Sequence, residues 1–374
     1  MLDDISQAVL AHEDVARYLR GAGGEPDSEV RGRIEGYLEE LRTTQRYSFY
    51  RALKHPLYPI LRKVERLHEN IQIVHAATAA GRVIYVSDHK SHLDYLIEPL
   101  VLDDNGVRPP VIAAGINLFG GPLGLLHKHV TGAIPIRRNT KDPAYLVTLK
   151  AYVAELLRRR DLLFYMEGGR SYTGELKAPK TGLLHAAMQA SVEALVVIPM
   201  AIAYDLVLED HILPHLGGRH QPFSRELAEM VRYAVGYESR AFVTFGPAIP
   251  VSNYDPSSRR DIMNLAHRLR DTIGRLYKVL PTALVAAAMR PSITQRQLEE
   301  RVGALIETLR ATGANLSTVN PARAASEGTN LLAARGIIVI ERGSRFRVRQ
   351  RTVLRYYART IQHLVAPRRT SAAH

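Results

Sequence analysis

The stretch Val83-Ile-Tyr-Val-Ser-Asp-His89-Lys-Ser-His-Leu-Asp94 holds both the signal that decides the fold and the first candidate chemistry. Its β-branched and aromatic start, Val83 to Val86, predicts a buried strand. The run from Tyr95 to Leu102 has the apolar spacing of a short amphipathic helix. His89 is therefore expected at a junction between a strand and a helix, five positions ahead of Asp94.

The pair formed by His89 and Asp94 has two interpretations. Residues five apart on a regular helix point in different directions, so the side chains meet only if His89 precedes the first helical turn. Ser91, followed three residues later by Asp94, resembles a capping box and predicts such a turn. The pair is then a general base with its orienting carboxylate, and His92 is a rival base. Alternatively, Asp94 only caps the helix and His89 is an ordinary loop residue.

Apolar runs of strand type alternate with helical runs from Gly81 to about Pro250. The expected strands are Val83 to Val86, Val111 to Ala114, Ala133 to Ile136, Leu162 to Met166, Leu195 to Ile202 and Ala241 to Phe245. This alternation predicts an α/β fold with a largely parallel mixed sheet flanked by helices. Ligands bind beyond the carboxyl ends of strands in such sheets, and His89 follows one of those ends.

Three regions are expected along the 374 residues. Residues 1–75 predict a helical N-terminal region, in which Val64 and Leu67 continue the helical spacing. Residues 76–280 hold the α/β domain. Residues 281–374 predict a small basic α+β region.

Composition narrows the chemistry. A hydrophobic content of 46% over 374 residues is enough for a sizeable core. The sequence has no cysteine, which excludes disulfides, thiolate nucleophiles and thiolate metal sites. The acidic N-terminus, with Asp3 and Asp4, does not have the pattern of a signal peptide. The apolar stretch Ala194–Tyr204 is well short of the ~20 residues that a helix needs to cross a bilayer, so we expect no transmembrane span.

The formal net charge of +13 predicts attraction to polyanions. Much of this positive charge lies after Asn320, where the sequence has eleven arginines and only two glutamates. In the region from residue 281 onward, a helix, Thr294 to Leu309, is followed by a hairpin around Gly343-Ser344 and a last helix, an order that resembles a winged helix. The partner is an anionic membrane surface or nucleic acid. Without a recognised nucleic-acid motif we expect the membrane, with peripheral attachment on its cytoplasmic side.

Two further segments suit an anionic ligand. Glu167-Gly-Gly-Arg170-Ser171 follows a predicted strand, and its glycines admit a close backbone approach while its arginine offers a planar fork for phosphate. An ordinary surface loop is the alternative. Gly132-Ala-Ile-Pro-Ile-Arg137-Arg138 ends in two arginines, of which at most one is expected to face a shared ligand, because neighbouring strand residues face opposite sides. His127 and His129 lack a carboxylate partner, so we expect no metal site.

The order of these segments resembles the motif series of the glycerol-3-phosphate O-acyltransferases, bacterial membrane-bound type, which are related to dihydroxyacetone phosphate acyltransferases. The series is His-x4-Asp, Gly-Ala-x-x-Ile-Arg-Arg, Glu-Gly-Gly-Arg-Ser-x-Thr-Gly with Pro-Lys-Thr-Gly, and Ile-Pro-x4-Tyr-Asp. The resemblance covers about Val83 to Pro250. Tyr356-Tyr357 and His363-Leu364 are similar to the C-terminal region of these enzymes.

The resemblance implies that His89 deprotonates the hydroxyl of glycerol 3-phosphate, which then attacks an acyl-CoA or acyl-carrier-protein thioester in the first step of phospholipid synthesis. Asp94 would orient the imidazole, and neither an acyl-enzyme nor a cofactor beyond the acyl donor is implied. Pro199 would lie beside the donor. The resemblance places these residues around the phosphorylated acceptor: Arg137, Arg138, Glu167, Gly168, Arg170, Ser171 and Lys180.

Three residues depart from the family pattern. Tyr172 stands where these enzymes usually have a second arginine, and Ile134 and Pro135 stand where they usually have aromatics. The acceptor therefore stays open between glycerol 3-phosphate, dihydroxyacetone phosphate and lysophosphatidate. A basic nucleic-acid-binding protein and an inactive scaffold with the same fold are the other hypotheses.

Overall fold

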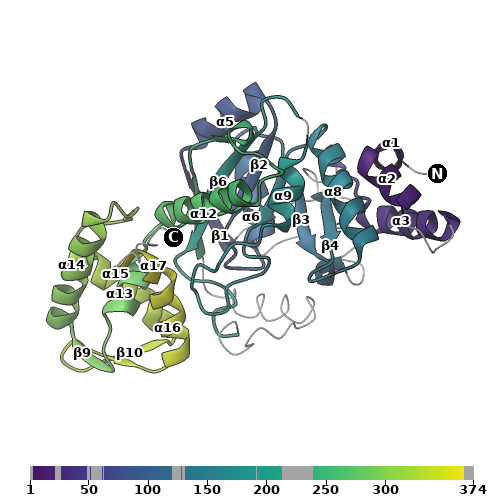
Figure 1. Ribbon diagram of the computed structural model, residues 1–374. Helices are drawn as coiled ribbons and strands as arrows, with labels where there is room; N and C mark the ends of the chain where they lie inside the picture. The colour runs from purple at the N-terminus through teal and green to yellow at the C-terminus, as the bar shows by residue number, and fades with distance from the viewer. Residues whose placement is uncertain are drawn as a thin grey trace.

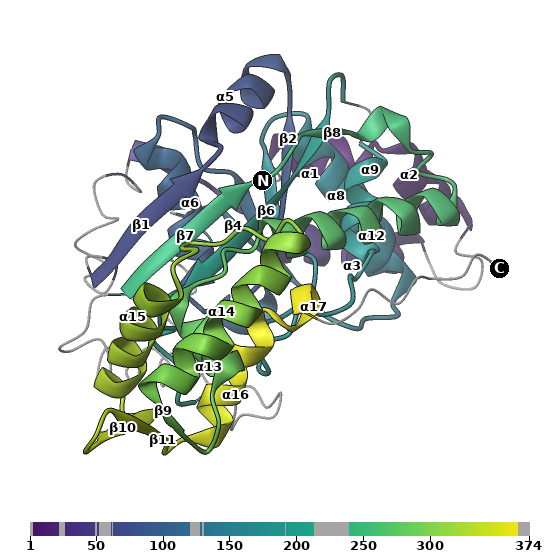
Figure 2. The same cartoon turned by 90° about the vertical axis from the view of Figure 1, so that its left-hand side faces the viewer.

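The computed structural model describes residues 3–21, 27–48, 51, 61, 63–119, 128, 131–190, 192–212 and 239–365. Within them a central sheet is flanked by helices, and a second, mainly helical unit lies beside the edge formed by β1 and β7 (Figures 1 and 2). The N-terminal helices lie at the opposite end of the molecule, next to α8 and β4 (Figure 1).

The central sheet has eight strands in the order β1-β7-β6-β2-β5-β3-β4, and β8 pairs with β6. All pairs are parallel except those of β6 with β7 and with β8. The bounds are β1 Val64–Glu69, β2 Val83–Ser87, β3 Val111–Gly115, β4 Ala133–Ile136, β5 Leu162–Tyr165, β6 Val196–Tyr204, β7 Ser239–Phe245 and β8 Ile249–Pro250. The predicted largely parallel mixed sheet and its six predicted strands are confirmed.

The edge strand β1 corrects the helical interpretation of Val64 and Leu67. Val64–Glu69 pairs in parallel with β7, from Val64 opposite Ser239 to Glu69 opposite Thr244 (Figure 2). A spacing of three fits a helix, but the neighbouring strand supplies backbone partners that a local pattern does not reveal. The predicted helical N-terminal region, residues 1–75, is therefore wrong over this strand.

Helices cover both the sheet and its N-terminal end. The N-terminal helices α1, α2 and α3 pack on α8, and α12 packs on β6. The bounds are α1 Asp4–Leu10, α2 Glu13–Gly21, α3 Asp27–Leu41, α5 Ile71–Ala80, α6 Asp94–Asp104, η2 Ile116–Phe119, α8 Pro143–Leu157, α9 Gly182–Met188, η4 Val251–Asn253 and α12 Arg259–Leu276. The prediction of an amphipathic helix after His89 is wrong in one respect, because α6 is buried on every side from Asp94 to Asp103.

The C-terminal unit has a helix, a strand, two helices and a two-stranded hairpin, followed by two short helices. Its bounds are α13 Pro281–Ala288, β9 Ser292–Thr294, α14 Gln295–Ala311, α15 Pro321–Ala334, β10 Ile338–Glu341, β11 Arg345–Val348, α16 Arg351–Thr360 and α17 Gln362–Val365. The antiparallel sheet order β10-β11-β9 completes a winged-helix-like arrangement. The predicted hairpin and the helix after Thr294 are confirmed, and Thr294 and Gln297 form the capping box of α14.

Candidate active site

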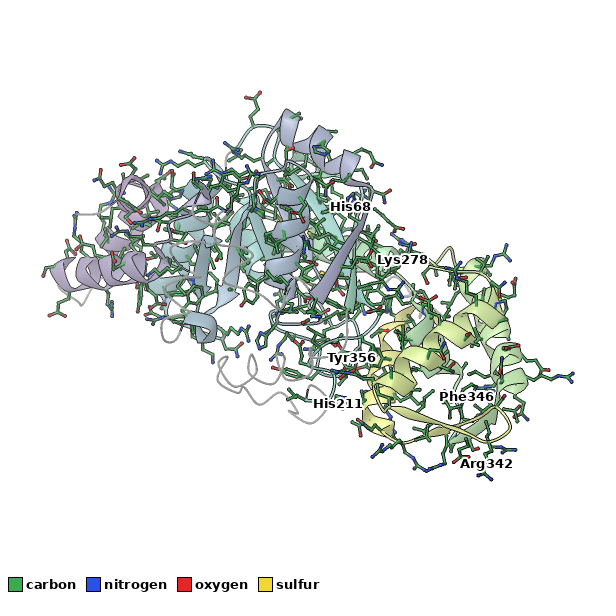
Figure 3. All side chains as sticks on the ribbon, turned by 180° about the vertical axis from the view of Figure 1, so that it is seen from behind. His68, His211, Lys278, Arg342, Phe346 and Tyr356 are labelled. Atoms are coloured by element: carbon green, nitrogen blue, oxygen red, sulfur yellow. The ribbon has the colours of Figure 1, made fainter. Side chains whose placement is uncertain are left out.

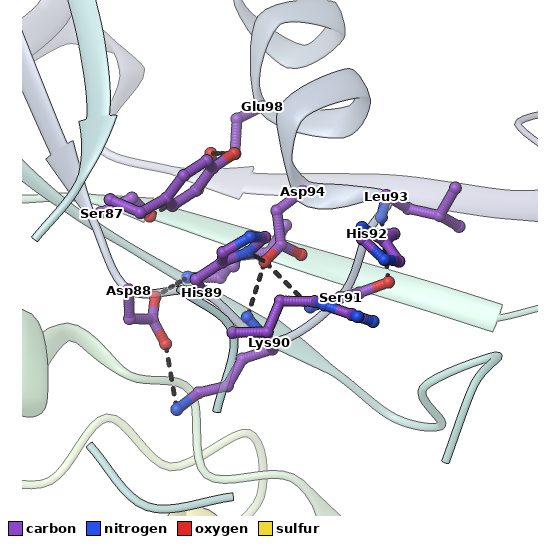
Figure 4. Close-up of polar contacts among 12 residues, drawn as sticks. Ser87, Asp88, His89, Lys90, Ser91, His92, Leu93, Asp94 and Glu98 are labelled. Atoms are coloured by element: carbon purple, nitrogen blue, oxygen red, sulfur yellow. Dashed lines mark hydrogen bonds and ion pairs between the residues drawn. The ribbon is translucent and has the colours of Figure 1, made fainter. Parts of the chain in front are cut away.

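His89 and Asp94 meet in the loop between β2 and α6. The His89 Nδ1 atom lies 2.8 Å from Asp94 Oδ2, and the same oxygen accepts the backbone N–H groups of Lys90 at 2.6 Å and Ser91 at 2.9 Å (Figure 4). The other oxygen accepts the Tyr204 hydroxyl at 2.7 Å. His89 lies before the first helical turn, as their convergence requires.

The turn also contains part of the expected cap. The Asp94 carboxylate accepts the Ser91 N–H, which is half of a capping box. The Ser91 hydroxyl accepts the Leu93 N–H at 3.0 Å and donates to Glu209 at 2.9 Å. The structural and the catalytic interpretations of Asp94 are thus compatible. His92 lies on the same turn, where its backbone N–H is bonded to Glu209 at 2.6 Å.

The imidazole of His89 is held by a stacked ring as well as by Asp94. The Tyr165 ring lies parallel to it, 4.1 Å between centroids and 15° between planes. The Tyr165 hydroxyl donates to Glu98 at 2.8 Å, one turn along α6 from Asp94. Fixing both the plane and the Nδ1 atom leaves Nε2 as the nitrogen that can accept a proton.

Electrostatics favour the neutral form of this imidazole. Burial, together with the positive charges of Arg170 and Arg138, lowers the pKa of His89 well below 6.5. Burial raises the pKa of Asp94 to about 7, against the opposing hydrogen bonds from Tyr204, Ser91 and Lys90. His89 is consequently unprotonated at neutral pH, which is the state a general base requires.

The loop after β5 is tied to the His89 loop through its backbone. The Ser171 N–H donates to the His89 carbonyl at 2.8 Å, and the Ser171 hydroxyl donates to the Glu175 carbonyl at 2.7 Å. Gly168 has a φ of 67°, and a Cβ there would lie 2.6 Å from the Lys180 side chain. Glycine therefore allows both the left-handed backbone and the close approach of Lys180.

Glu167 differs from its neighbours in that it has charged lysines nearby but its carboxylate is not tied by hydrogen bonds to the described side chains. The side chain is buried, and neither carboxylate oxygen has a hydrogen-bond partner among the described residues. Burial raises the pKa of Glu167 to about 7, while the charge of Lys90 opposes this. A buried polar group left open in this way is a candidate for pairing with a ligand.

The two adjacent arginines turn to different partners. Arg137 is bonded to Glu40 at 2.8 Å, and its guanidinium lies over the rings of Tyr37 and Tyr145 at 4.9 and 5.5 Å. Arg138 makes no hydrogen bond or ion pair with another described residue, and a Cβ at Gly169 would lie 3.5 Å from its Nη1 atom. Arg138 is therefore the arginine whose guanidinium lies open against the loop after β5.

The remaining predicted residues lie at different depths. Arg170 is 5% exposed, pairs with Glu209 at 3.5 Å and lies over the Tyr172 ring at 5.4 Å. Lys180 is exposed at the cavity described below, and its N–H donates to the Met166 carbonyl at 2.7 Å. Pro199 lies in β6 opposite Val86, away from the residues that line that cavity.

A cavity of about 1000 Å³ opens beside His89. Basic and glycine residues line one part of it, including Arg138, Gly168 and Lys180. Its other walls are largely apolar and come from β3, β4, β5, α8 and α9, with these side chains among them: Ala113, Ile136, Leu146, Leu149, Phe164 and Leu183. The volume is at the upper end of what small-molecule sites have, and its two linings suit a ligand with an anionic and an apolar part.

The sequence did not reveal the roles of Tyr165, Glu98, Glu209 and Tyr204. Tyr204 lay in a quoted motif without a function, and its bond to Asp94 depends on β6 lying next to β2. A carboxylate at Glu98, four residues after Asp94 on one helix, was an available signal for a shared face.

The described residues carry neither a candidate metal centre nor a candidate membrane span. They contain no group of three histidine, cysteine, aspartate or glutamate side chains that could hold a metal ion. The possible pair His127 and His129 lies outside them. Among the helices that the structure describes, none is both long and apolar enough to cross a membrane.

Comparisons with known proteins agree with the motif series. A family model described as Acyltransferase matches residues 65–203, and one described as Glycerol-3-phosphate acyltransferase C-terminal region matches residues 237–373. A crystal structure of the 1-acyl-sn-glycerophosphate acyltransferase PlsC from Thermotoga maritima is similar with a TM-score of 0.34 and 16% identity, over 71% of this chain and 93% of that one. A TM-score this low does not place the chain in the fold of that enzyme.

Two curated relatives carry the same activity in their names. The glycerol-3-phosphate acyltransferase of Actinobacillus succinogenes is 33% identical over 60% of this chain and 29% of that protein. The enzyme of the same name from Aeromonas hydrophila is 30% identical over 70% of this chain and 34% of that protein. The chain thus spans about a third of the length of these relatives. Both family models match in order along the chain, so two successive segments of it are similar to acyltransferases, and the relatives named here are glycerol-3-phosphate acyltransferases.

Proposed function

We propose that this chain moves a fatty acyl group from an acyl-CoA or acyl-carrier-protein thioester to glycerol 3-phosphate, the first step of phospholipid synthesis. The observation that carries the proposal is the bond from His89 to Asp94 beside a cavity with basic and apolar walls. The matches to the two family models support the choice of reaction.

The reaction needs one proton carrier and no covalent intermediate on the protein. His89 Nε2 takes the proton of the acceptor hydroxyl while that oxygen attacks the thioester carbonyl. The tetrahedral adduct collapses, the C–S bond breaks, and the imidazolium returns the proton to the leaving thiolate. Asp94 stabilises the imidazolium because its carboxylate is fixed by four hydrogen bonds.

The acceptor phosphate would bind where cations converge. Arg138 has an open guanidinium, and Arg170 and Lys180 lie on the adjoining loop. Charge-assisted bonds to phosphate contribute roughly 1.5–3 kcal/mol each. A bound dianion would also offset the cations that lower the pKa of His89, so that the base becomes stronger when the acceptor is present.

The test is glycerol-3-phosphate-dependent release of thiol from an acyl thioester by purified protein. His89→Ala should abolish it, whereas the control His75→Ala on the exposed face of α5 should not change it. A folded His89→Ala protein with wild-type turnover would exclude this mechanism. Dihydroxyacetone phosphate and lysophosphatidate, offered at equal concentration, would identify the preferred acceptor.

The same proposal includes peripheral attachment to the cytoplasmic face of a membrane, where the acylated product partitions. The segment that runs from the hairpin of β10 and β11 into α16 exposes basic side chains, namely Arg342, Arg345, Arg347, Arg349, Arg351 and Arg355. Ile340 beside them is 53% exposed. Such a surface suits anionic lipid headgroups, each basic residue adding about 1 kcal/mol near the membrane.

The winged-helix-like arrangement does not favour nucleic acid as the partner. The second helix of a helix-turn-helix normally enters the groove. Here α15 is attached to the α/β domain, since Glu327 pairs with Arg240 at 2.6 Å and Arg335, just after the helix, pairs with Asp210 at 3.0 Å. We expect sedimentation with vesicles that contain phosphatidylserine, and neither with neutral vesicles nor with duplex DNA. Binding to DNA at moderate salt would reverse this choice.

A further inference from the structure

We infer that the C-terminal unit is part of the active site, and that Lys90 is the positioning residue through which it holds the His89 loop. The inference rests on the proposed function. It concerns a buried lysine and a tyrosine of α16, Tyr356, to which the motif series gives no role. Tyr356 lies on the side of the C-terminal unit that faces the sheet, and Arg342 lies at the opposite end (Figure 3).

Lys90 is next to the base in sequence and almost completely enclosed. It is 2% exposed, and its ammonium lies 3.4 Å from the Asp88 carboxylate (Figure 4). Asp88 is itself fixed by the Ile202 N–H of β6 at 2.9 Å. Burial lowers the pKa of Lys90, but Asp88 and Glu167 more than offset this, so the side chain stays charged. A buried ammonium is unfavourable unless such partners hold it.

The other contacts of Lys90 are with the loop after β5 and with two tyrosines of the C-terminal half of the chain. Its ammonium donates to the Gly174 carbonyl at 3.2 Å and lies 5.4 Å from the centre of the Tyr277 ring, just after α12. The Tyr356 hydroxyl lies 3.4 Å from the Lys90 carbonyl, which it faces as a donor. The backbone of Lys90 therefore contacts α16 directly, while its side chain contacts the loop after β5 and Tyr277.

Gly174 is the point of closest approach between α16 and the loop after β5. Its φ is 86°, and a Cβ there would lie only 2.1 Å from the Tyr356 carbonyl oxygen. Any larger residue would push α16 away from this loop. Because the Gly174 carbonyl also accepts from Lys90, such a displacement would be transmitted to the residue beside His89.

A second set of contacts fixes α16 from the other side. The Tyr357 hydroxyl donates to Asp210 at 2.7 Å and accepts the Val207 N–H at 3.0 Å. The neighbouring residue, Glu209, holds the Ser91 hydroxyl at 2.9 Å. The position of α16 therefore affects the turn that carries His89 at two residues, Lys90 and Ser91.

The first test removes the charge of Lys90 and keeps a side chain of similar length. Lys90→Met should lower kcat by roughly 10- to 100-fold, as a misplaced base does, and leave KM for both substrates within about threefold. Lys90→Arg should recover part of the loss. The control Lys63→Met changes an exposed lysine before β1 and should leave kcat unchanged.

The second test separates backbone strain from contact with α16. Gly174→Ala and Gly106→Ala both place a Cβ on a residue with positive φ, 86° and 76°, but the Cβ at Gly106 would meet no other group within 4 Å. Both should lose similar stability through strain, and only Gly174→Ala should lower kcat. If Gly174→Ala does not fold, Tyr356→Phe removes the hydroxyl with little change of shape and should lower kcat severalfold.

A titration of the His89 imidazole by NMR tests the inference without turnover. The charged groups around it are Asp94 and Glu98 of α6, Arg138 after β4, Glu167, Arg170 and Lys177 after β5, and Asp88 and Lys90 on its own loop. Lys90 is one of the cations that lower the pKa of His89, so Lys90→Met should raise that pKa. A merely destabilised protein would not show this change.

The outcomes separate the two proposals. Wild-type protein without acyl transfer would refute the proposed function, while the His89 titration would still decide the role of Lys90. Folded Lys90→Met and Tyr356→Phe proteins with wild-type kcat and an unchanged His89 titration would overturn the inference.

Discussion

The loop after β2 and the loop after β5 lie side by side, yet their polar groups are satisfied to different degrees. In the first, Asp94 accepts four hydrogen bonds and His89 is both bonded and stacked. In the second, the buried Glu167 has no hydrogen-bond partner in the described chain. Arg138, which faces this loop, likewise pairs with none of the residues described.

This difference assigns separate tasks to the two loops. A site for proton transfer gains from groups fixed before the substrate arrives, because no reorganisation is then needed during the reaction. A site for a phosphorylated ligand needs charges that are still available for it. Changes in the first loop should therefore act mainly on kcat, and changes in the second mainly on KM.

The largest effect is expected from Asp94→Asn. An amide cannot accept all four hydrogen bonds or stabilise an imidazolium, so kcat should fall by about 10²–10⁴-fold with KM little changed. Steady-state kinetics would measure this. Asp104→Asn, at the other end of α6 and paired with Arg66, is the matched control and should stay near wild type. A rise in KM alone would remove the contrast between the loops.

The next effect compares the two neighbouring arginines. Arg138→Gln should raise KM for glycerol 3-phosphate by about 10- to 100-fold, because an open cation is lost. Arg137→Gln should alter KM less than threefold and lower Tm instead, since this guanidinium is bonded to Glu40. Equal effects on KM would show that both arginines reach the phosphate.

A smaller effect should be seen in the pH dependence of wild-type kcat/KM. Burial and cations lower the pKa of His89 well below 6.5, so the neutral base persists as the pH falls through 6.5. The acid limb should accordingly lie below that value, and Arg138→Gln should move it upward. A limb above pH 6.5 would contradict the proposed environment of the base.

The smallest effect concerns stability through Glu167. Its folded pKa of about 7 exceeds the ordinary 4.5, so the folded protein holds an extra proton between these values and loses stability as the pH rises through 7. Glu167→Gln removes this loss. Between pH 6 and pH 8, the Tm of Glu167→Gln should fall by about 2–4 °C less than the Tm of the wild type, as measured in a calorimetric scan. Parallel Tm curves would mean that Glu167 is already paired.

The α/β domain was largely predictable, whereas parts of the site were not. Runs such as Val83–Ser87 and Leu162–Tyr165 carry their burial in their own composition, so their strands follow from local pattern. Val64–Glu69 looked helical because its strand partner, β7, is far away in sequence. Likewise, the open state of Arg138 and the bonded state of Arg137 depend on Glu40, which the spacing of two arginines cannot show.

The sequence by itself determined six strands of the central sheet, the place of His89 after one of them, and the turn that lets Asp94 reach it. Those features arise from neighbours in the chain, whose spacing limits where side chains can point. Only the tertiary structure decided that Tyr204 and Tyr165 contact the pair and that the α16 tyrosines hold the neighbouring segments. Their positions depend on strand neighbours and on packing between residues that lie 67 to 266 positions apart, and local preference does not encode such contacts.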